Sequence, residues 1–222
     1  NGKLDSIYYY YEKAIDITSI KSKKISTYGK LILIAENNQD KIQASKYLVA
    51  LGDIAPEQMR IDARMKWLTY QRELGNYEQI IVEIQRMLTM SEFSKEYMQL
   101  ELELGKVYKA KHDFNLAKDV FEMMVEKYSK KNESAGAYYH LGYIALMEDF
   151  NIDLAADYFQ KSKDEKPSSY YGRQSKDFLT KINKYETLID TYKDLSDISK
   201  ENMPLDSSLV TITNNTDKPM PD

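Results

Sequence analysis

The chain has 222 residues with a formal charge of −4 at neutral pH, and 42% of its residues are hydrophobic and 30% charged. This composition is typical of a folded protein with a sizeable core, and the lack of a basic surplus argues against nucleic acid as the main partner. Because the chain contains no cysteine, disulfides, thiolate zinc sites and cysteine nucleophiles are excluded.

Residues that break helices are scarce along the chain. It contains 8 glycines and 5 prolines, and no proline lies between Pro56 and Pro167. This pattern favours helices throughout. The longest purely apolar run, Leu31 to Ala35, is far shorter than the roughly 20 residues that span a bilayer, so no transmembrane segment is predicted. The sequence contains no signal peptide and Asn1 is not a native start, so we expect the chain to be part of a longer protein.

Two sets of positions recur at steps of 37 residues. The first set consists of Leu31, Leu68, Gly105 and Gly142. The second set consists of Ala14, Leu51, Leu88, Val125 and Ser162. Two sets in phase over four or five copies indicate a structural repeat, which we interpret as a stack of helical hairpins.

In chain order, residues 4–20 predict a single helix that matches the second helix of a unit. Four helix pairs are then expected over about 24–56, 57–92, 94–130 and 133–167. Each pair has a polar turn between its helices, where Gly75 suits a left-handed helix end. Each second helix carries two side chains four residues apart on the face that must be buried, namely Ala44/Leu48, Ile80/Ile84, Ala117/Phe121 and Ala155/Phe159.

The C-terminal part divides into two segments. Residues 168–195 predict one long amphipathic helix, in which Tyr171, Phe178 and Ile182 are among the residues spaced to pack back on the array and cap it. Residues 196–222 are rich in Ser, Asn, Asp and Pro, so we expect a disordered or extended tail. Within this tail only Leu209 to Thr213 has strand character, without a partner strand.

The repeated residues resemble the tetratricopeptide repeat (TPR) family. The family pattern of Leu-Gly-x-x-Tyr followed by Ala-x-x-x-Phe is matched best by Leu104 to Tyr108 and by Ala117 to Phe121. The period of 37 exceeds the family's usual value of about 34, so longer helices or connections are expected. The resemblance implies an all-α fold, an α-α superhelix of about four to five helix hairpins with a long C-terminal capping helix.

The sequence offers no motif for metal binding or catalysis. Asp149-x-Asn151-x-Asp153 resembles the opening of a calcium loop, but Leu154 and Gln160 occupy the positions of the required Gly and Glu. We interpret this segment as a solvated turn with a helix cap. We therefore predict no catalytic, cofactor-binding or metal-binding residue and no enzymatic activity.

The two histidines are isolated, and no phosphate-binding glycine loop occurs. His112 is expected in an exposed turn, and His140 as a packing or groove residue of a first helix. The nineteen tyrosines have two interpretations. They pack between helices with their hydroxyls reaching water, or they form a binding surface, where aromatic residues are enriched.

In the TPR family the first helices of the units line a concave groove that commonly holds the ligand. The resemblance carries this role to ten positions, Tyr28, Ile32, Met65, Thr69, Arg72, Leu102, Lys106, Lys109, Tyr139 and Tyr143. These apolar, aromatic and basic side chains would suit an extended or helical peptide with some acidic character. The partners implied are other proteins or peptides, and the oligomeric state is not predicted.

Two more specific resemblances concern opposite ends of the chain. Ala137 to Gly142 and Pro167 to Tyr171 are similar to periplasmic repeat lipoproteins of outer-membrane assembly and the Tol-Pal system. Asp5 to Ile15 is similar to repeat arrays of bacterial sensors and transcription regulators. The favoured prediction is a protein-interaction scaffold of the cell envelope. The alternative is a sensor module of a larger, cytoplasmic regulatory protein.

Overall fold

The computed structural model describes residues 2–201, and every regular element in this range is helical. The elements are α1 (Gly2–Ile17), α2 (Lys21–Asn37), α3 (Lys41–Ile54), α4 (Glu57–Glu73), α5 (Tyr77–Leu88), the 3-10 helix η1 (Ser91–Phe93), α6 (Tyr97–Ala110), α7 (Phe114–Lys127), α8 (Asn132–Met147), α9 (Ile152–Glu165) and α10 (Tyr170–Glu201).

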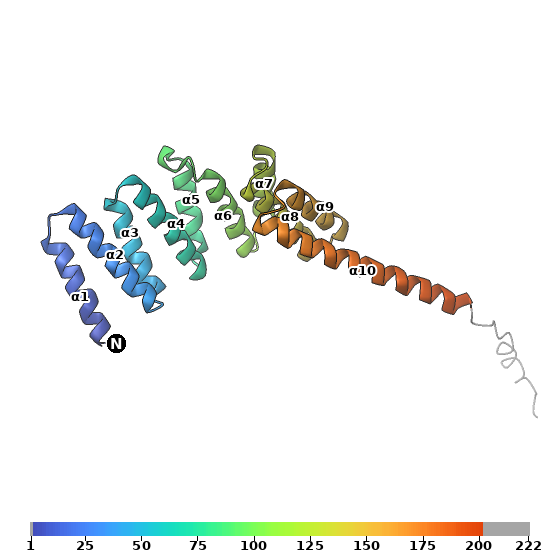
Figure 1. Cartoon of the computed structure of the whole chain (residues 1–222), viewed down its shortest axis with the longest axis horizontal. Helices are drawn as coiled ribbons and strands as arrows, with labels where there is room; N and C mark the ends of the chain where they lie inside the picture. The colour runs from blue at the N-terminus through green and yellow to red at the C-terminus, as the bar shows by residue number, and fades with distance from the viewer. Residues whose placement is uncertain (1, 202–222) are drawn as a thin grey trace, which may run out of the picture. The chain divides into compact units, whose positions relative to one another are not determined.

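From α1 to α9 the helices stack in chain order, each against the next (Figure 1). α1 packs on α2, and the hairpins α2–α3, α4–α5, α6–α7 and α8–α9 follow one another, with α6 also contacting α8. The predicted all-α fold of stacked hairpins with a long C-terminal helix is therefore confirmed. We refer to α2, α4, α6 and α8 as the first helices, and to their hairpin partners as the second helices.

The C-terminal helix is longer than predicted. α10 continues to Glu201, six residues beyond the predicted end at residue 195, because no proline or glycine lies between residue 195 and Pro204. From Asp177 onward the chain forms a second compact unit, described as far as residue 201. The rest of the predicted tail, 202–222, including Leu209 to Thr213, lies outside the described residues.

The turn inside each hairpin uses one residue in the left-handed backbone region. Gly75 has φ of 76°, as predicted, and the equivalent turns place Gln39, His112 and Phe150 at 58°, 64° and 53°. Only glycine adopts this conformation without a steric penalty. The hairpin geometry is therefore repeated even where the sequence lacks the residue that favours it.

Helix caps begin two of the second helices. Asp40 accepts a hydrogen bond of 3.0 Å from the backbone N–H three residues later, and Asn151 does the same at 3.0 Å. Each bond satisfies one N–H that has no partner within its helix. The interpretation of residues 149–153 as a turn with a helix cap is thereby confirmed.

Glycines allow the helices of two hairpins to cross closely. A Cβ atom on Gly105 of α6 would lie 2.4 Å from the ring of Phe121 in α7, and one on Gly142 of α8 would lie 2.9 Å from Phe159 in α9. Both phenylalanines are fully buried, as are the alanines one turn before them. The 37-residue recurrence of Gly105 and Gly142 thus marks the points where an aromatic ring packs directly on backbone.

The core runs continuously through the stack. Its three clusters of buried side chains centre on α1–α4, α4–α6 and α6–α9. Trp67 packs against both the first and the second cluster, and Tyr108 and Val120 pack against both the second and the third. No helix within residues 2–201 is both long enough and apolar enough to cross a bilayer.

Candidate protein-binding face

The ten residues that the TPR resemblance nominates lie on α2, α4, α6 and α8. Five of them take no part in the charged contacts of the other five, namely Tyr28, Ile32, Met65, Thr69 and Leu102. Ile32 and Leu102 are core residues with only 7% and 5% of their surface exposed. Tyr28 and Met65 are half-buried and pack against the core clusters. Thr69 is exposed and donates to the Met65 carbonyl at 3.4 Å.

The other five, Arg72, Lys106, Lys109, Tyr139 and Tyr143, are brought together by two groups of contacts. In the first group, the carboxylate of Glu103 on α6 accepts hydrogen bonds from Arg72 on α4 and from Lys106 one helical turn further along α6. All three side chains are between one-fifth and one-third exposed. One carboxylate therefore holds two cations at the junction of α4 and α6.

The second group surrounds Lys109. Its Nζ lies 3.2 Å from Nδ1 of His140 and 4.3 Å from the centre of the Tyr143 ring, both on α8. No ion pair joins Lys109 to a carboxylate within residues 2–201. Burial, together with the nearby positive charge of Lys106, lowers the pKa of Lys109. Lys109 is thus a partly desolvated cation held by an imidazole and an aromatic face rather than by an anion.

Aromatic rings enclose His140. Phe121 stacks on it at 5.2 Å between centroids, and Tyr139 and Tyr171 approach it edge-on at 5.2 and 5.6 Å. Burial and the charges of Lys109 and Lys106 lower the pKa of His140 well below its usual value, so the imidazole is neutral near pH 7. A neutral Nδ1 can accept a hydrogen bond from the Lys109 ammonium, which fixes the remaining proton on the buried Nε2.

Tyr171, at the start of α10, completes this arrangement. Burial is the main cause that raises the pKa of Tyr171 to about 12. The nearby carboxylate of Glu103 adds to this shift, and Arg72 opposes it. The hydroxyl therefore stays protonated at neutral pH. Gly136 of α8 leaves room for the ring, because a Cβ atom there would lie 2.8 Å from it. We call the whole set the basic-aromatic cluster, which consists of Arg72, Glu103, Lys106, Lys109, Tyr139, His140, Tyr143 and Tyr171.

The basic-aromatic cluster carries a net charge of about +2 at neutral pH, because three cations face one carboxylate and His140 is neutral. Sequence reasoning missed Glu103 and did not place Tyr171 here. The spacing of Glu103 and Lys106, three residues apart on one helix, was a signal for their pairing. No comparable signal connects Tyr171 to α4 and α6, since that proximity depends on the contacts of its ring with Tyr139, His140 and Gly136 of α8.

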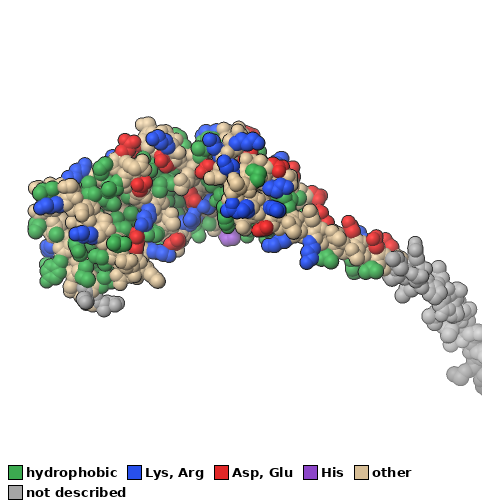
Figure 2. Space-filling view, in the orientation of Figure 1, with side chains coloured by type: hydrophobic (Ala, Val, Ile, Leu, Met, Phe, Trp, Pro, Cys, Tyr) green, Lys and Arg blue, Asp and Glu red, His purple; other side chains and the backbone are tan. Residues whose placement is uncertain are grey.

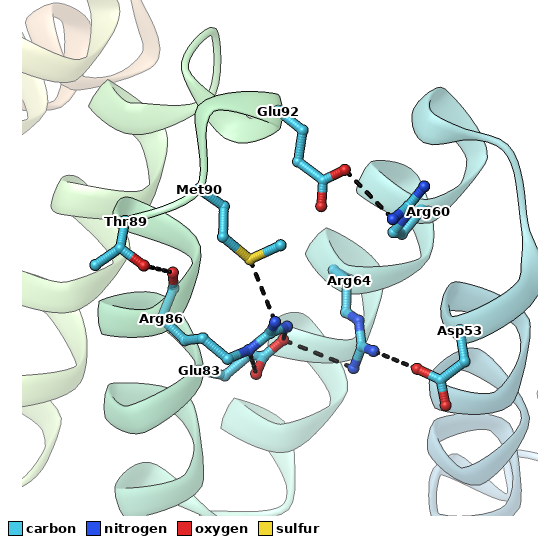
Figure 3. A network of polar contacts seen from close by, with 8 residues as sticks. All are labelled: Asp53, Arg60, Arg64, Glu83, Arg86, Thr89, Met90 and Glu92. Atoms are coloured by element: carbon cyan, nitrogen blue, oxygen red, sulfur yellow. Dashed lines mark hydrogen bonds and ion pairs between the residues drawn. The ribbon is translucent and has the colours of Figure 1, made fainter.

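A second polar network joins α3, α4 and α5 (Figure 3). Arg64 of α4 lies 2.7 Å from Asp53 and 3.6 Å from Glu83. Arg86 donates twice to Glu83, at 2.9 and 2.6 Å. Arg64 is largely buried, with 14% of its side chain exposed, and it packs so closely on α3 that a Cβ atom on Gly52 would lie 3.1 Å from its Nε.

The charges of this network cancel. Arg60 and Glu92, 3.4 Å apart, add one further pair, so that the network holds three arginines and three carboxylates. All of these except Glu83 line a pocket of about 210 Å³. A balanced network has no surplus charge to attract an ionic ligand, and bidentate arginine contacts of this kind fix geometry. We therefore interpret it as a set of contacts that holds the hairpins α2–α3 and α4–α5 together, rather than as a binding site.

A larger pocket of about 630 Å³ lies beside the α2–α3 turn, with Glu36, Asp40, Ile42 and Tyr70 in its wall. Several of its polar groups pair within the chain: Tyr70 donates to Glu36 at 2.9 Å, and Lys41 lies 2.7 Å from Glu73.

Two features of the described part of the chain bear on metal and nucleic-acid binding. No group of three or more His, Cys, Asp or Glu side chains there is placed to hold a metal ion. On the face drawn in Figure 2, Lys and Arg side chains alternate with Asp and Glu instead of forming one large basic patch.

No family model matches the sequence, and the search of curated proteins gives no match. The resemblance to TPR proteins therefore stays a prediction.

Proposed function

We propose that this chain is a non-catalytic scaffold of the TPR type, which binds an acidic segment of another protein on the face formed by its first helices. The basic-aromatic cluster carries the proposal, because it gathers three cations from α4 and α6 next to aromatic rings from α8 and the start of α10. Binding would proceed by burial and charge complementarity on a rigid stack, without turnover.

Lys109 is the residue on which we expect binding to depend most. It is already partly desolvated and ordered against Tyr143, so a partner carboxylate would reach it at little further cost in solvation or side-chain entropy. A carboxylate would also offset the repulsion between Lys109 and Lys106, which adds to the effect of burial in lowering the pKa of Lys109. Tyrosine rings next to such a cation are typical of the residues that dominate binding energy.

A random library of 12-residue peptides displayed on phage tests the proposal. We expect selection on the full chain to enrich peptides containing Asp or Glu, and calorimetry to give a dissociation constant for a selected synthetic peptide. Lys109→Ala should raise the dissociation constant of that peptide by about tenfold to a hundredfold, because a charge-assisted hydrogen bond contributes roughly 1.5–3 kcal/mol.

Lys161→Ala is the matched control. Lys161 is a half-exposed lysine of α9 that pairs with Asp157 on its own helix, so its removal should leave peptide affinity unchanged. The proposal is wrong if no peptide is enriched, or if the selected peptides bind Lys109→Ala as tightly as the parent chain.

A further inference from the structure

The amine of Lys109 has surroundings that are unusual for a lysine side chain. Its Nζ lies 3.2 Å from Nδ1 of His140 and 4.3 Å from the centre of the Tyr143 ring. It makes no ion pair with a carboxylate of residues 2–201. The side chain is half-buried rather than fully enclosed, so small molecules in solution can reach the amine.

Several other lysines of the chain are held by anions. Lys127 lies 2.7 Å from Glu101 and Lys161 lies 2.7 Å from Asp157, and the hydrogen bond to each carboxylate raises the pKa of its lysine. The pKa of Lys109 is instead lowered, by burial and by the charge of Lys106. At a given pH a larger fraction of Lys109 is therefore the free amine, which is the nucleophilic form.

His140 holds this amine in place without supplying a negative charge. Its imidazole is buried, neutral near pH 7 and packed against Phe121 and Tyr171. An N–H of the uncharged amine can still donate to Nδ1, which leaves the nitrogen lone pair of Lys109 free to attack an electrophile. A lysine that is desolvated and lies next to another cation is a known kind of activated nucleophile.

We propose that Lys109 is an acylation site, at which the amine attacks the carbonyl carbon of a thioester. A C–N bond forms, the C–S bond breaks, and the sulfur leaves with the electron pair of that bond. The thiolate takes up the proton that the nitrogen loses, so the products are an amide on Lys109 and a free thiol. Thioesters of a phosphate-bearing carrier suit the site, because the basic-aromatic cluster has a net charge of about +2. Lys109 is consumed by the reaction, so the step involves no turnover.

Acylation would also remove the charge on which we expect peptide binding to depend. An amide nitrogen carries no positive charge, so the net charge of the basic-aromatic cluster would fall from about +2 to about +1. The modified chain should therefore bind acidic peptides more weakly. This regulatory consequence rests on the proposed function, whereas the reaction at Lys109 does not.

Incubation of the full chain with acetyl-coenzyme A, followed by mass spectrometry of its peptides, tests the acylation site. We expect acetylation of Lys109 to be about tenfold faster than that of Lys161 in the same molecules near neutral pH. Lys161 is the internal control, because its side chain is 50% exposed and exposure alone would make it the faster of the two. In concentrated urea the two rates should become equal, since both amines are then solvated. The chain has no cysteine, so the thiol released comes from the donor alone.

The pH dependence of the two rates separates activation of the amine from access to it. Each rate rises with pH as the free amine forms, so the half-maximal rate of Lys109 should lie at a lower pH than that of Lys161. The charged groups around Lys109 are those of the basic-aromatic cluster, in which Arg72 and Glu103 pair with each other. Lys106→Gln removes the neighbouring cation and should slow acetylation of Lys109 about threefold, with no change at Lys161.

Three results would overturn the acylation site. The first is acetylation of Lys109 in the folded chain that is no faster than that of Lys161. The second is a half-maximal pH for Lys109 at or above that for Lys161. The third is a rate ratio that persists in urea, since local sequence rather than the fold would then set the reactivity.

Calorimetry with a selected acidic peptide separates this proposal from the proposed function. We expect the chain acetylated at Lys109 to bind the peptide about tenfold to a hundredfold more weakly than the parent chain. Unchanged affinity after acetylation would refute the part of Lys109 in peptide binding and the regulatory consequence, and it would leave the acylation site established by the mass spectra.

Discussion

Replacing Gly105 by alanine tests whether the recurring glycine marks a direct contact between an aromatic ring and the backbone. The added Cβ atom would lie 2.4, 2.7 and 2.8 Å from three atoms of the Phe121 ring. Contacts this short require movement, and the ring cannot move freely because it is fully buried and stacks on His140 at 5.2 Å. The substitution must therefore separate α6 from α7 or displace the ring.

Two opposing effects set the expected magnitude. Overpacking a core by one carbon typically costs about 1–3 kcal/mol of unfolding free energy. Alanine in a helix interior gains roughly 0.5–1 kcal/mol over glycine. We expect Gly105→Ala to lower the free energy of unfolding by about 1–2 kcal/mol, because the steric effect is the larger of the two.

Gly29→Ala is the matched control. Gly29 lies inside α2, another first helix, and a Cβ atom added there would have no neighbouring atom within 4 Å. The same change should therefore stabilise the chain by about 0.5–1 kcal/mol, giving opposite signs at two helical glycines. Urea titrations followed by the circular dichroism of the helices give both values.

The double variant Gly105→Ala with Phe121→Leu identifies the contact. Leucine removes the ring edge that the new methyl group would meet, so the double variant should lose less than the sum of the two single changes. The reasoning is refuted if Gly105→Ala stabilises the chain as Gly29→Ala does, or if the two changes at the crossing are simply additive.

Two further predictions concern single residues. Phe150→Gly should stabilise the chain by about 0.5–1 kcal/mol. Phe150 is 83% exposed and holds a left-handed φ of 53°, which costs a bulky residue more than it costs glycine. An unchanged or lower midpoint of urea unfolding would contradict this. The lowered pKa of His140 means that the unfolded chain takes up a proton below about pH 6.5 while the folded chain resists it. Stability should therefore fall as pH falls from about 7 to about 5.5, by about 1 kcal/mol more in the parent than in His140→Leu, and equal losses in urea titrations at both pH values would exclude this linkage.

The sequence alone determined the class of fold and the hairpin repeat. Apolar side chains that recur every three to four residues define helical faces locally, and the return of Gly105 as Gly142 after 37 residues identifies the unit. Gly75 was placed correctly in its turn because glycine has an intrinsic preference for positive φ. These features depend on one residue or one helix at a time, so they can be read without coordinates.

Only the tertiary structure decided which side chains of the first helices act together. The contacts of Arg72 with Glu103 and of Lys109 with His140 each join residues 31 positions apart, on helices whose relative rotation is set by packing of the core. The same packing buries Ile32 and Leu102, although the repeat pattern nominates them for the binding face together with accessible residues such as Thr69. Sequence periodicity fixes the face of a helix, but the depth and partners of a side chain depend on how closely its neighbours approach, and that distance is a property of the whole stack.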